Sequence, residues 1–564
     1  MKLTSEYDQN FIQSMIEAGK VTRRQFMGGA AGVTAAAVAA TLSGCGGSDS
    51  GSAGGDASDS KKVLRFAQKN SKVGMDPHTM NDQYAYSLSE PVSEAPCMFT
   101  EDGEEVPCLL TKMPEVSDDG LTYSLELKSD ITCHDGSKLT ASDVKWSVER
   151  MLWPETKYKS AYMINQIEGA ADVIAGTTKE LAGITVVDDT HVTIKLTQAF
   201  SSFLNILGTI YFIIFPQAAV EAAEAAGETW GAGTSFVGTG PFKLVSNDDT
   251  TEVVYEKFAE YHGTPANIDE LHISFIDDVN TKMLSFVNGD IDLCDVDATL
   301  LEQYMNDDTV KDQLHSYEPL STFFINLNLS RESLQDVRVR KAISLAVNRQ
   351  ELCDTVLHGA GTPASCWLNP NVPGHDDSLS ALEYDPEKAK ELLAEAGVSG
   401  LTLDCPVRQS EATLAQAVQG YLAEVGITLN VSTLDSGTWS TYWRQGDLET
   451  TILSWNILFA DGDQQMYSYF YSESASAKGS YYNNAEFDQL LLDARAEVDS
   501  DKRVELYKQA DAILVQQDMG TVPLYYPKRY FAAKDYVKNM KVGGLIYHFR
   551  DVDIDLEKQA EQSK

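Results

Sequence analysis

The stretch Ile131-Thr-Cys-His-Asp-Gly-Ser-Lys-Leu-Thr-Ala-Ser-Asp-Val-Lys-Trp-Ser-Val-Glu-Arg150 contains a turn and the beginning of a helix in quick succession. Asp135-Gly136 predicts the turn. Thr140-Ala-Ser-Asp143 has the form of a capping box, and apolar residues recur at helical spacing over 144–151. Ahead of this stretch, apolar side chains alternate along 121–127, which predicts a strand with one buried face. The order strand, turn, helix indicates an α/β protein.

Later stretches show related patterns. Asp385-Pro386 predicts the first residues of a helix, because it combines an N-cap with a proline at the first helical position, and Gly397 predicts its end. Gly426 follows an apolar stripe over 414–425, and alternating apolar residues over 427–431 come directly after it. A helix followed by a strand is therefore predicted here.

A further amphipathic helix is predicted after Asp336. Its basic residues Arg338, Lys341 and Arg349 lie largely off the apolar face, so we expect them on a solvated surface. The run 206–215 is almost wholly apolar but too short to span a membrane, and it is predicted to form a buried strand or helix.

The length of 564 residues is far more than one ordinary domain needs. The composition, 43% hydrophobic and 23% charged, is typical of a globular protein with ample core material. The net charge of −40 repels phosphate backbones, which disfavours nucleic acid as a partner.

Near the N-terminus, Thr22-Arg-Arg-Gln-Phe-Met27 resembles the twin-arginine export signal. The Ala-rich run 28–42 follows, and Leu42-Ser-Gly-Cys45 resembles a lipoprotein signal-peptidase box, in which the Cys45 thiol accepts the lipid. A transmembrane anchor is the alternative, but the run is shorter than the roughly 20 residues of a spanning helix. We predict that 1–44 is a signal peptide and that 45–61, rich in Gly and Ser, is a flexible linker. The expected location is extracytoplasmic, at the cell surface or in the periplasm, with the protein anchored to the membrane by its lipid.

Beyond the lipid-box residue, the chain has seven cysteines. Cys97 with Cys108, and Cys353 with Cys366, are close enough in sequence to close short loops in an oxidising exterior, although spacing does not fix connectivity. Cys133 lies in an apolar strand position and is predicted to be a small buried side chain.

Several blocks resemble the extracellular solute-binding proteins of the dipeptide, oligopeptide and nickel ABC importers. The stretch 131–150, together with 116–123, resembles the N-terminal signature of that family, with Cys133 where an aromatic residue is usual. Further blocks follow in the family's order: Val237-Gly-Thr-Gly-Pro-Phe-Lys-Leu244, Asn288-Gly-Asp-Ile-Asp292, Phe324-Ile-Asn326, Asp336-Val-Arg-Val-Arg-Lys-Ala342, Tyr384-Asp-Pro-Glu-Lys-Ala389 and Leu422-Ala-Glu-Val-Gly-Ile427. The resemblance extends over 75–530, nearly the whole body of the chain.

The resemblance implies an α/β, two-lobed fold of the periplasmic-binding-protein kind, with mixed sheets, a hinge and an extra subdomain in the first lobe. Domain I would comprise 62–321 and 523–564, with the subdomain at about 98–215, and domain II would comprise 322–522. Two crossings of the chain between the lobes would form the hinge. A ligand held between the lobes would then stabilise the closed form.

In peptide-binding members of this family, a tryptophan is followed three residues later by an aspartate that neutralises the peptide's α-ammonium group. Here Trp455 is followed by Asn456, Ile457 and Leu458, so the carboxylate is missing. A buried ammonium without a charge partner costs several kcal/mol, which disfavours an ordinary peptide with a free amino end. Asp461 and Asp463 would replace the carboxylate only in a differently shaped loop, and a solvated turn is the alternative for both.

Aromatic residues are the other ligand candidates, because flat rings bury much area with little loss of rotamer freedom. For each tryptophan, the lobe core or rim is the alternative. Trp439 and Trp443 are four residues apart, so a helix would place them on one face. Arg408 follows the strand-like 401–407 and is a candidate to hold a carboxylate bidentately. Tyr84 and Tyr86 are candidates because the stretch 84–89 resembles the family's first-lobe loops that face the cleft. The predicted ligand-binding residues are Tyr84, Tyr86, Trp367, Arg408, Trp439, Trp443, Trp455, Asn456, Phe459 and Asp461.

A metal site is disfavoured, because the histidines are scattered and none follows Trp455 within 464–481. His134 lies in the signature turn, where we expect a structural role.

These observations predict a monomeric, lipid-anchored solute-binding subunit of an ABC importer, with no cofactor and no enzymatic activity. It would capture small peptides or peptide-like solutes and deliver them to the permease transmembrane subunits. An oligosaccharide or another organic solute is the alternative cargo, favoured by the tryptophans and by Leu458. A secreted hydrolase is a remote alternative, because no G-x-S-x-G or H-E-x-x-H motif is present. A signalling or adhesion lipoprotein, which would hold no ligand in a cleft, is a third.

Overall fold

The computed structural model describes residues 61–562, except 72–73, 81, 101–102, 159, 380–381 and 544–545. The predicted signal peptide, almost all of the predicted linker and Cys45 lie outside the described residues. The described residues belong to one compact unit. No helix in this part of the chain is long and apolar enough to cross a membrane.

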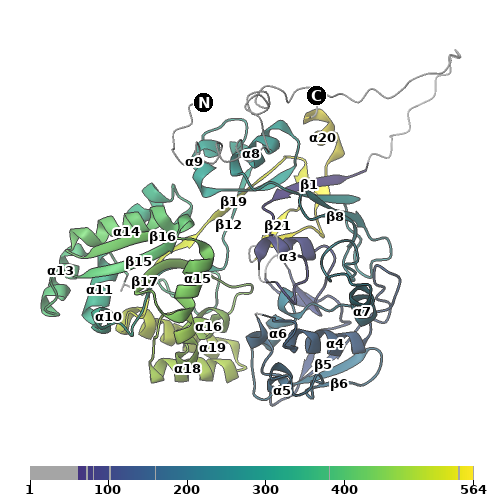
Figure 1. Cartoon of the computed structure of the whole chain (residues 1–564), viewed down its shortest axis with the longest axis horizontal. Helices are drawn as coiled ribbons and strands as arrows, with labels where there is room; N and C mark the ends of the chain where they lie inside the picture. Colours follow the sequence, from purple (N-terminus) through teal and green to yellow (C-terminus); the bar gives the residue numbers. More distant parts are fainter. Residues whose placement is uncertain are drawn as a thin grey trace, which may run out of the picture. The chain divides into compact units, whose positions relative to one another are not determined.

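A seven-stranded mixed sheet combines segments from both ends of the chain (Figure 1). At its centre, β1 (Val63–Gln68) is parallel to β10 (Glu270–Phe275) and to β11 (Leu293–Val296). The strand β19 (Arg529–Ala533) lies antiparallel between β11 and β12 (Leu314–Tyr317). The strands β9 (Glu252–Lys257) and β8 (Phe242–Asp248) complete the other edge. In Figure 1 the purple β1 and the yellow β19 thus belong to one sheet, as a lobe built from both chain ends requires.

A separate four-stranded sheet contains the strand predicted from the alternating residues, β5 (Thr122–Glu126). It pairs with β4 (Glu115–Val116) and β7 (His191–Lys195), and β7 pairs with β6 (Ile184–Val186). The predicted helix is α4 (Ala141–Leu152), and its capping box is present, because the Thr140 N–H donates to the Asp143 carboxylate at 2.8 Å. The strand, turn and helix predictions are confirmed.

The third main group of elements surrounds a four-stranded sheet in the order β14 (Gly361–Pro363), β18 (Val522–Pro527), β13 (Ser321–Leu327) and β17 (Thr450–Asn456). Beside it, β15 (Thr402–Arg408) is parallel to β16 (Thr428–Leu434). The helices α13 (Pro386–Glu395) and α14 (Ala412–Glu424) begin and end close to the predicted residues.

The chain passes between the seven-stranded sheet and this third sheet twice. The first pass, 318–320, joins β12 to β13, and the second, Lys528, joins β18 to β19. The two passes run side by side, since β13 pairs with β18 and β12 pairs with β19. The bounds of the lobes themselves stay a prediction.

The remaining elements are short or flank these sheets. The strands are β2 (Cys97–Phe99), β3 (Glu105–Pro107), β20 (Val537–Lys538), β21 (Lys541–Gly543), β22 (Ile546–His548) and β23 (Asp553–Ile554). The principal other helices are α3 (Gln83–Ser89), α5 (Ala170–Ile174), α6 (Phe203–Ile206), α7 (Gln217–Ala225), α8 (Val279–Asn288), α9 (Ala298–Met305), α10 (Glu332–Gln335), α11 (Val337–Ala346), α15 (Ser436–Gln445), α18 (Ala485–Ala496), α19 (Ser500–Ala512) and α20 (Leu556–Gln562).

One basic residue near α11 departs from the prediction of a solvated surface. Arg349 is buried, and its guanidinium donates to the carbonyl oxygens of Leu382 and Pro523, both at 2.7 Å. Burial lowers the pKa of Arg349 to about 9. The prediction was wrong for Arg349, because its acceptors come from segments that are distant in sequence. Arg338 does lie at the surface, where it pairs with Asp336.

The apolar run 206–215 is buried as predicted, but as the end of α6 and a 3-10 turn (Ile210–Phe212) rather than as one element. The seven described cysteines are all buried free thiols, so the structure contains neither of the two disulfides that the spacing allowed. Cys133 is fully buried in an apolar cluster, as predicted.

Candidate functional site

The loop that follows Trp455 is fixed by one glutamine side chain. The N–H groups of Leu458 and Phe459 both donate to the Gln464 amide oxygen, at 2.8 and 3.3 Å. The Ile457 N–H donates at 2.9 Å to the carbonyl of Leu320, a residue of the first pass between the sheets. The loop therefore keeps a defined shape at the end of β17.

The two aspartates of this loop are buried and paired, so the alternative of a solvated turn is wrong for both. Asp461 accepts a hydrogen bond from Arg503 at 2.7 Å and another from the Asp463 N–H at 2.8 Å. Asp463 lies 3.1 Å from Arg495, in an ion pair without the alignment of a hydrogen bond. Burial raises the pKa of Asp463 to about 6. Both carboxylates are already occupied by arginines of this chain.

The same loop joins candidate residues from the two predicted lobes. Leu458 packs against an apolar cluster of first-lobe residues that includes Ala85 and Tyr86 from α3. Phe459 is 3% exposed and belongs to the apolar cluster of the subdomain, whose other members lie within 97–214. Nearby, the Ser201 N–H donates to the Arg495 carbonyl at 3.0 Å. The structure thus brings Tyr86 and Phe459 to one region.

Four of the predicted residues form, together with one lysine, a row of rings and cations that we call the aromatic row: Arg408, Trp439, Trp443, Lys478 and Trp455. Trp439 and Trp443 share one face of α15 and are stacked, with centroids 5.4 Å apart and planes at 16°. Arg408 lies 4.6 Å from the Trp439 ring, and the Lys478 amine lies 4.5 Å from the Trp455 ring. Lys478 was missed, because no motif marks it and only long-range packing places it here.

Arg408 does hold a carboxylate bidentately, but the carboxylate belongs to Glu411 of the same chain. Its Nε and Nη2 donate to the two Glu411 oxygens at 3.0 and 2.8 Å. Arg408 therefore holds the Trp439 ring in place while its own charge is neutralised.

The remaining candidates differ in exposure. Trp367 is fully buried, and its indole N–H donates to the Gln465 carbonyl at 3.1 Å. Asn456 is exposed at the end of β17. Burial raises the pKa of the Tyr84 hydroxyl to about 12. The role of each in ligand binding stays a prediction.

His134 has a structural environment, as expected. Its ring is buried, Nε2 lies 2.9 Å from the Gly240 carbonyl, and Nδ1 lies 3.3 Å from the Gly238 nitrogen. These contacts fix the neutral ring with the proton on Nε2.

One cluster contains a cysteine, a histidine and an aspartate, the residue types of a cysteine hydrolase, but its cysteine is not activated as a nucleophile. His375 Nδ1 lies 3.2 Å from the Cys366 sulfur, and Nε2 lies 2.9 Å from Asp377. However, Nδ1 also lies 2.7 Å from the Leu368 carbonyl, an acceptor that requires the proton on Nδ1. The Cys366 thiol is fully buried, and burial together with Asp511 raises its pKa far above the usual range. The thiolate that would act as nucleophile is therefore disfavoured.

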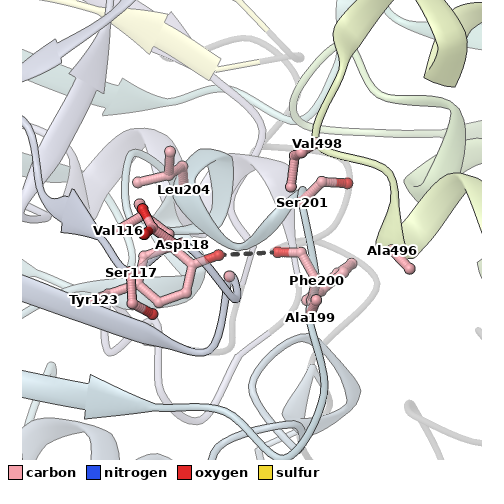
Figure 2. A pocket seen from close by; sticks show the side chains of 11 residues that line it. Val116, Ser117, Asp118, Tyr123, Ala199, Phe200, Ser201, Leu204, Ala496 and Val498 are labelled. Atoms are coloured by element: carbon pink, nitrogen blue, oxygen red, sulfur yellow. Dashed lines mark hydrogen bonds between the residues drawn. The ribbon is translucent and has the colours of Figure 1, made fainter.

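A hollow of about 350 Å³ lies beside the subdomain cluster that contains Phe459, since Tyr123 and Phe200 belong to that cluster and line the hollow (Figure 2). It is lined by residues within 116–123 and 199–204, together with Ala496, the last residue of α18, and Val498. The Tyr123 hydroxyl donates to the Phe200 carbonyl at 3.2 Å along one wall. None of the predicted ligand-binding residues lines this hollow.

Comparison with known proteins gives consistent matches along the chain. Residues 104–477 match the family described as bacterial extracellular solute-binding proteins, family 5 (middle). The dipeptide-binding protein of Escherichia coli is 27% identical over 516 residues, which cover 88% of this chain and 95% of that protein. Heme-binding protein A of Haemophilus influenzae is 27% identical over 480 residues, which cover 82% of this chain and 86% of that protein.

Solved structures show the same fold. The periplasmic binding protein DppA of Helicobacter pylori, in complex with the peptide STSA, has a TM-score of 0.74 at 24% identity, covering 88% of this chain and 98% of that chain. HbpA2 of Haemophilus parasuis has a TM-score of 0.74 at 24% identity, covering 87% of this chain and all of that chain. These structures are two-lobed periplasmic binding proteins, and the mixed α/β sheets described above correspond to that architecture. Because the family match covers more than half of the sequence, the chain belongs to the bacterial extracellular solute-binding proteins of family 5.

Proposed function

We propose that this protein is the lipid-anchored, monomeric substrate-binding subunit of an ABC importer, which captures peptides or peptide-like solutes by closing two lobes around them. The observation that carries the proposal is the contact of the loop after Trp455 with the first-lobe cluster around Tyr86. Tyr86 from the predicted first lobe and Phe459 from the predicted second lobe, both candidate ligand residues, lie in this region. The loaded form then docks on the permease subunits.

For the two domains we propose the bounds that were predicted from the sequence. Domain I comprises 62–321 and 523–564, and domain II comprises 322–522. Cys45 carries the lipid, and the Gly/Ser-rich linker joins it to the body on the outer side of the membrane.

The cargo is peptide-like rather than an ordinary peptide with a free amino end. Leu458 stands three residues after Trp455, where the peptide-binding relatives are expected to have a carboxylate, and Asp461 is occupied by Arg503. An ammonium group placed there would lose its water without gaining a charge partner.

Another organic solute or an oligosaccharide is the second candidate cargo. The partly buried ring of Trp455 favours it, because such rings bind flat apolar faces of many solutes. One relative, as its name states, is a heme-binding protein.

Native mass spectrometry of the purified protein tests the proposed function. We expect a one-to-one complex with a small peptide-like molecule, released unchanged on denaturation. Identification of the released molecule separates a peptide-like solute from a sugar. Chemical turnover of the captured molecule would contradict the proposal, and a peptide with a free amino end would contradict the argument from Leu458.

The variant Phe459→Ala is expected to favour the open form. Removing a buried phenylalanine costs roughly 3–5 kcal/mol, and here the lost contact is one that links the predicted lobes. The ratio of closed to open molecules should fall by at least about a hundredfold. Small-angle scattering of the protein with its co-purified solute should then show a larger radius of gyration.

The control for this variant is Tyr442→Ala, at an aromatic residue whose exposed fraction is 43%. It should leave the scattering unchanged. If Phe459→Ala keeps both the compact form and the solute, the loop is not part of the closure contact.

A further inference from the structure

Lys478 lies against two tryptophans of the aromatic row. Its amine nitrogen is 4.5 Å from the centroid of the Trp455 ring and 5.8 Å from that of Trp443. The Lys478 carbonyl accepts a hydrogen bond from the Tyr469 hydroxyl at 3.4 Å, which anchors this segment to the buried side of β13. Ring faces attract the ammonium but do not neutralise it.

Among the residues that the structure describes, the amine of Lys478 has no carboxylate partner. Within the same part of the chain, this amine makes neither an ion pair nor a hydrogen bond. The charged group that acts on it is another cation, Arg444, which lowers its pKa. The chain has 84 acidic residues against 44 basic ones, so carboxylates are not scarce. Burial, and then Arg444, lower the pKa of Lys478 to about 8, which leaves it mostly charged at pH 7.

Among its described residues, the loop that follows Trp455 offers no unpaired carboxylate. Leu458 packs into the apolar cluster around Tyr86. Asp461 is paired with Arg503, at 2.7 Å. The one uncompensated charged side chain in contact with Trp455 is therefore positive, among the described residues.

We infer that the cargo presents a carboxylate to Lys478, and that this lysine is a specificity-determining residue of the site. The inference rests on the proposed binding function and adds a charge to the chemical class of the cargo. A carboxylate on the open side of the ammonium replaces water with a charge-assisted hydrogen bond. The flat face of Trp455, which is only partly buried, then contacts the apolar part of the same molecule. Arg408 does not compete for the carboxylate, because Glu411 already occupies its guanidinium.

Paired probes test the inference on the purified full chain. A panel of N-acetylated dipeptides is titrated as free acids and as the corresponding primary amides, with tryptophan fluorescence as the readout. We expect the acids to bind at least about tenfold more tightly than their amides. Lys478→Met should weaken the acids by that factor and leave the amides nearly unchanged, and Lys478→Arg should keep the preference. The preference should also fade as the pH rises above about 8, where the amine loses its charge.

Lys534→Met is the matched control. Lys534 is another half-buried lysine over an aromatic ring, 4.3 Å from the Phe286 centroid, and burial lowers its pKa as well. This variant should keep the full preference for acids.

The outcomes separate the inference from the proposed function. Equal binding of acids and amides overturns the inference and leaves the function intact. A preference for acids that persists in Lys478→Met also overturns the assignment to Lys478. If the protein binds neither the acids nor the amides, this result overturns the proposed peptide-like cargo and, with it, the inference about Lys478.

Discussion

Replacing Glu94 with glutamine is expected to lower the free energy of unfolding by roughly 3–5 kcal/mol. The Glu94 carboxylate is buried and accepts hydrogen bonds from the Tyr261 hydroxyl, His262 Nε2 and Arg550 Nη2, each at 2.7 Å. Burial alone would raise the pKa of Glu94, but the hydrogen bond from His262 and the charge of Arg550 outweigh it and hold the pKa well below its usual range. Glutamine would leave the partly buried Arg550 guanidinium without its hydrogen-bonded counter-charge.

Urea unfolding at pH 7 measures this effect, and Glu115→Gln is the control. Glu115 also forms an ion pair, with Lys112 at 2.5 Å, but both side chains are more than half exposed. Exposed pairs contribute little, so we expect a change below about 1 kcal/mol there. A similar decrease in the free energy of unfolding for both variants would show that the hydrogen bonds and charge pairs of Glu94 do not stabilise the fold.

The second large effect is a pH dependence carried by His78. This imidazole is fully buried, its Nε2 lies 2.9 Å from the Ile213 carbonyl, and its Nδ1 lies 3.0 Å from Arg150 Nη1, which can only donate. Burial lowers the pKa of His78 from 6.5 to about 4, although the charge of Asp76 opposes this shift. Between these two values the unfolded chain binds a proton that the folded chain does not, so His78 makes stability fall as the pH falls.

The size of this effect is about 3 kcal/mol between pH 7 and pH 4, since one pKa unit corresponds to about 1.4 kcal/mol. Buried carboxyl groups such as Asp463, with a pKa of about 6, act in the opposite direction, so total stability does not isolate His78. The difference in stability between wild type and His78→Gln does isolate the contribution of His78. The destabilisation of this variant relative to wild type should shrink by about 3 kcal/mol as the pH is lowered to 4.

Unfolding curves at pH 7, 5.5 and 4 provide the measurement. His191→Gln, at an imidazole that is 48% exposed, is the control and should show no such convergence. A difference between wild type and His78→Gln that does not change with pH would mean that His78 is not held neutral in the folded protein.

Sequence patterns predicted those parts of the fold that depend on neighbouring residues. The capping box at Thr140 and the proline after Asp385 act within a single helical turn, and both helices begin there. The two-lobed fold was predicted from the family resemblance rather than from such local patterns. Burial that depends on distant partners was not predicted: the Pro523 carbonyl that accepts from Arg349 is 174 residues away.

The candidate site shows the same division. Trp439 and Trp443 were expected on one helical face, and they stack there. The pairing of Asp461 with Arg503, 42 residues later, has no signal in sequence. The contact of Lys478 has no signal in sequence either, because only the folding of η7 (Ser476–Lys478) against α15 and β17 places its amine over Trp455.

The two short passes of the chain between the sheets limit how the halves of the molecule can move. One pass has three residues and the other has one, and the strands that flank them are paired, with Phe323 and Tyr525 stacked 4.7 Å apart. A pair of neighbouring, tied backbones bends readily about one axis and resists torsion about the others. We therefore expect the proposed opening of the lobes to follow a single reproducible arc.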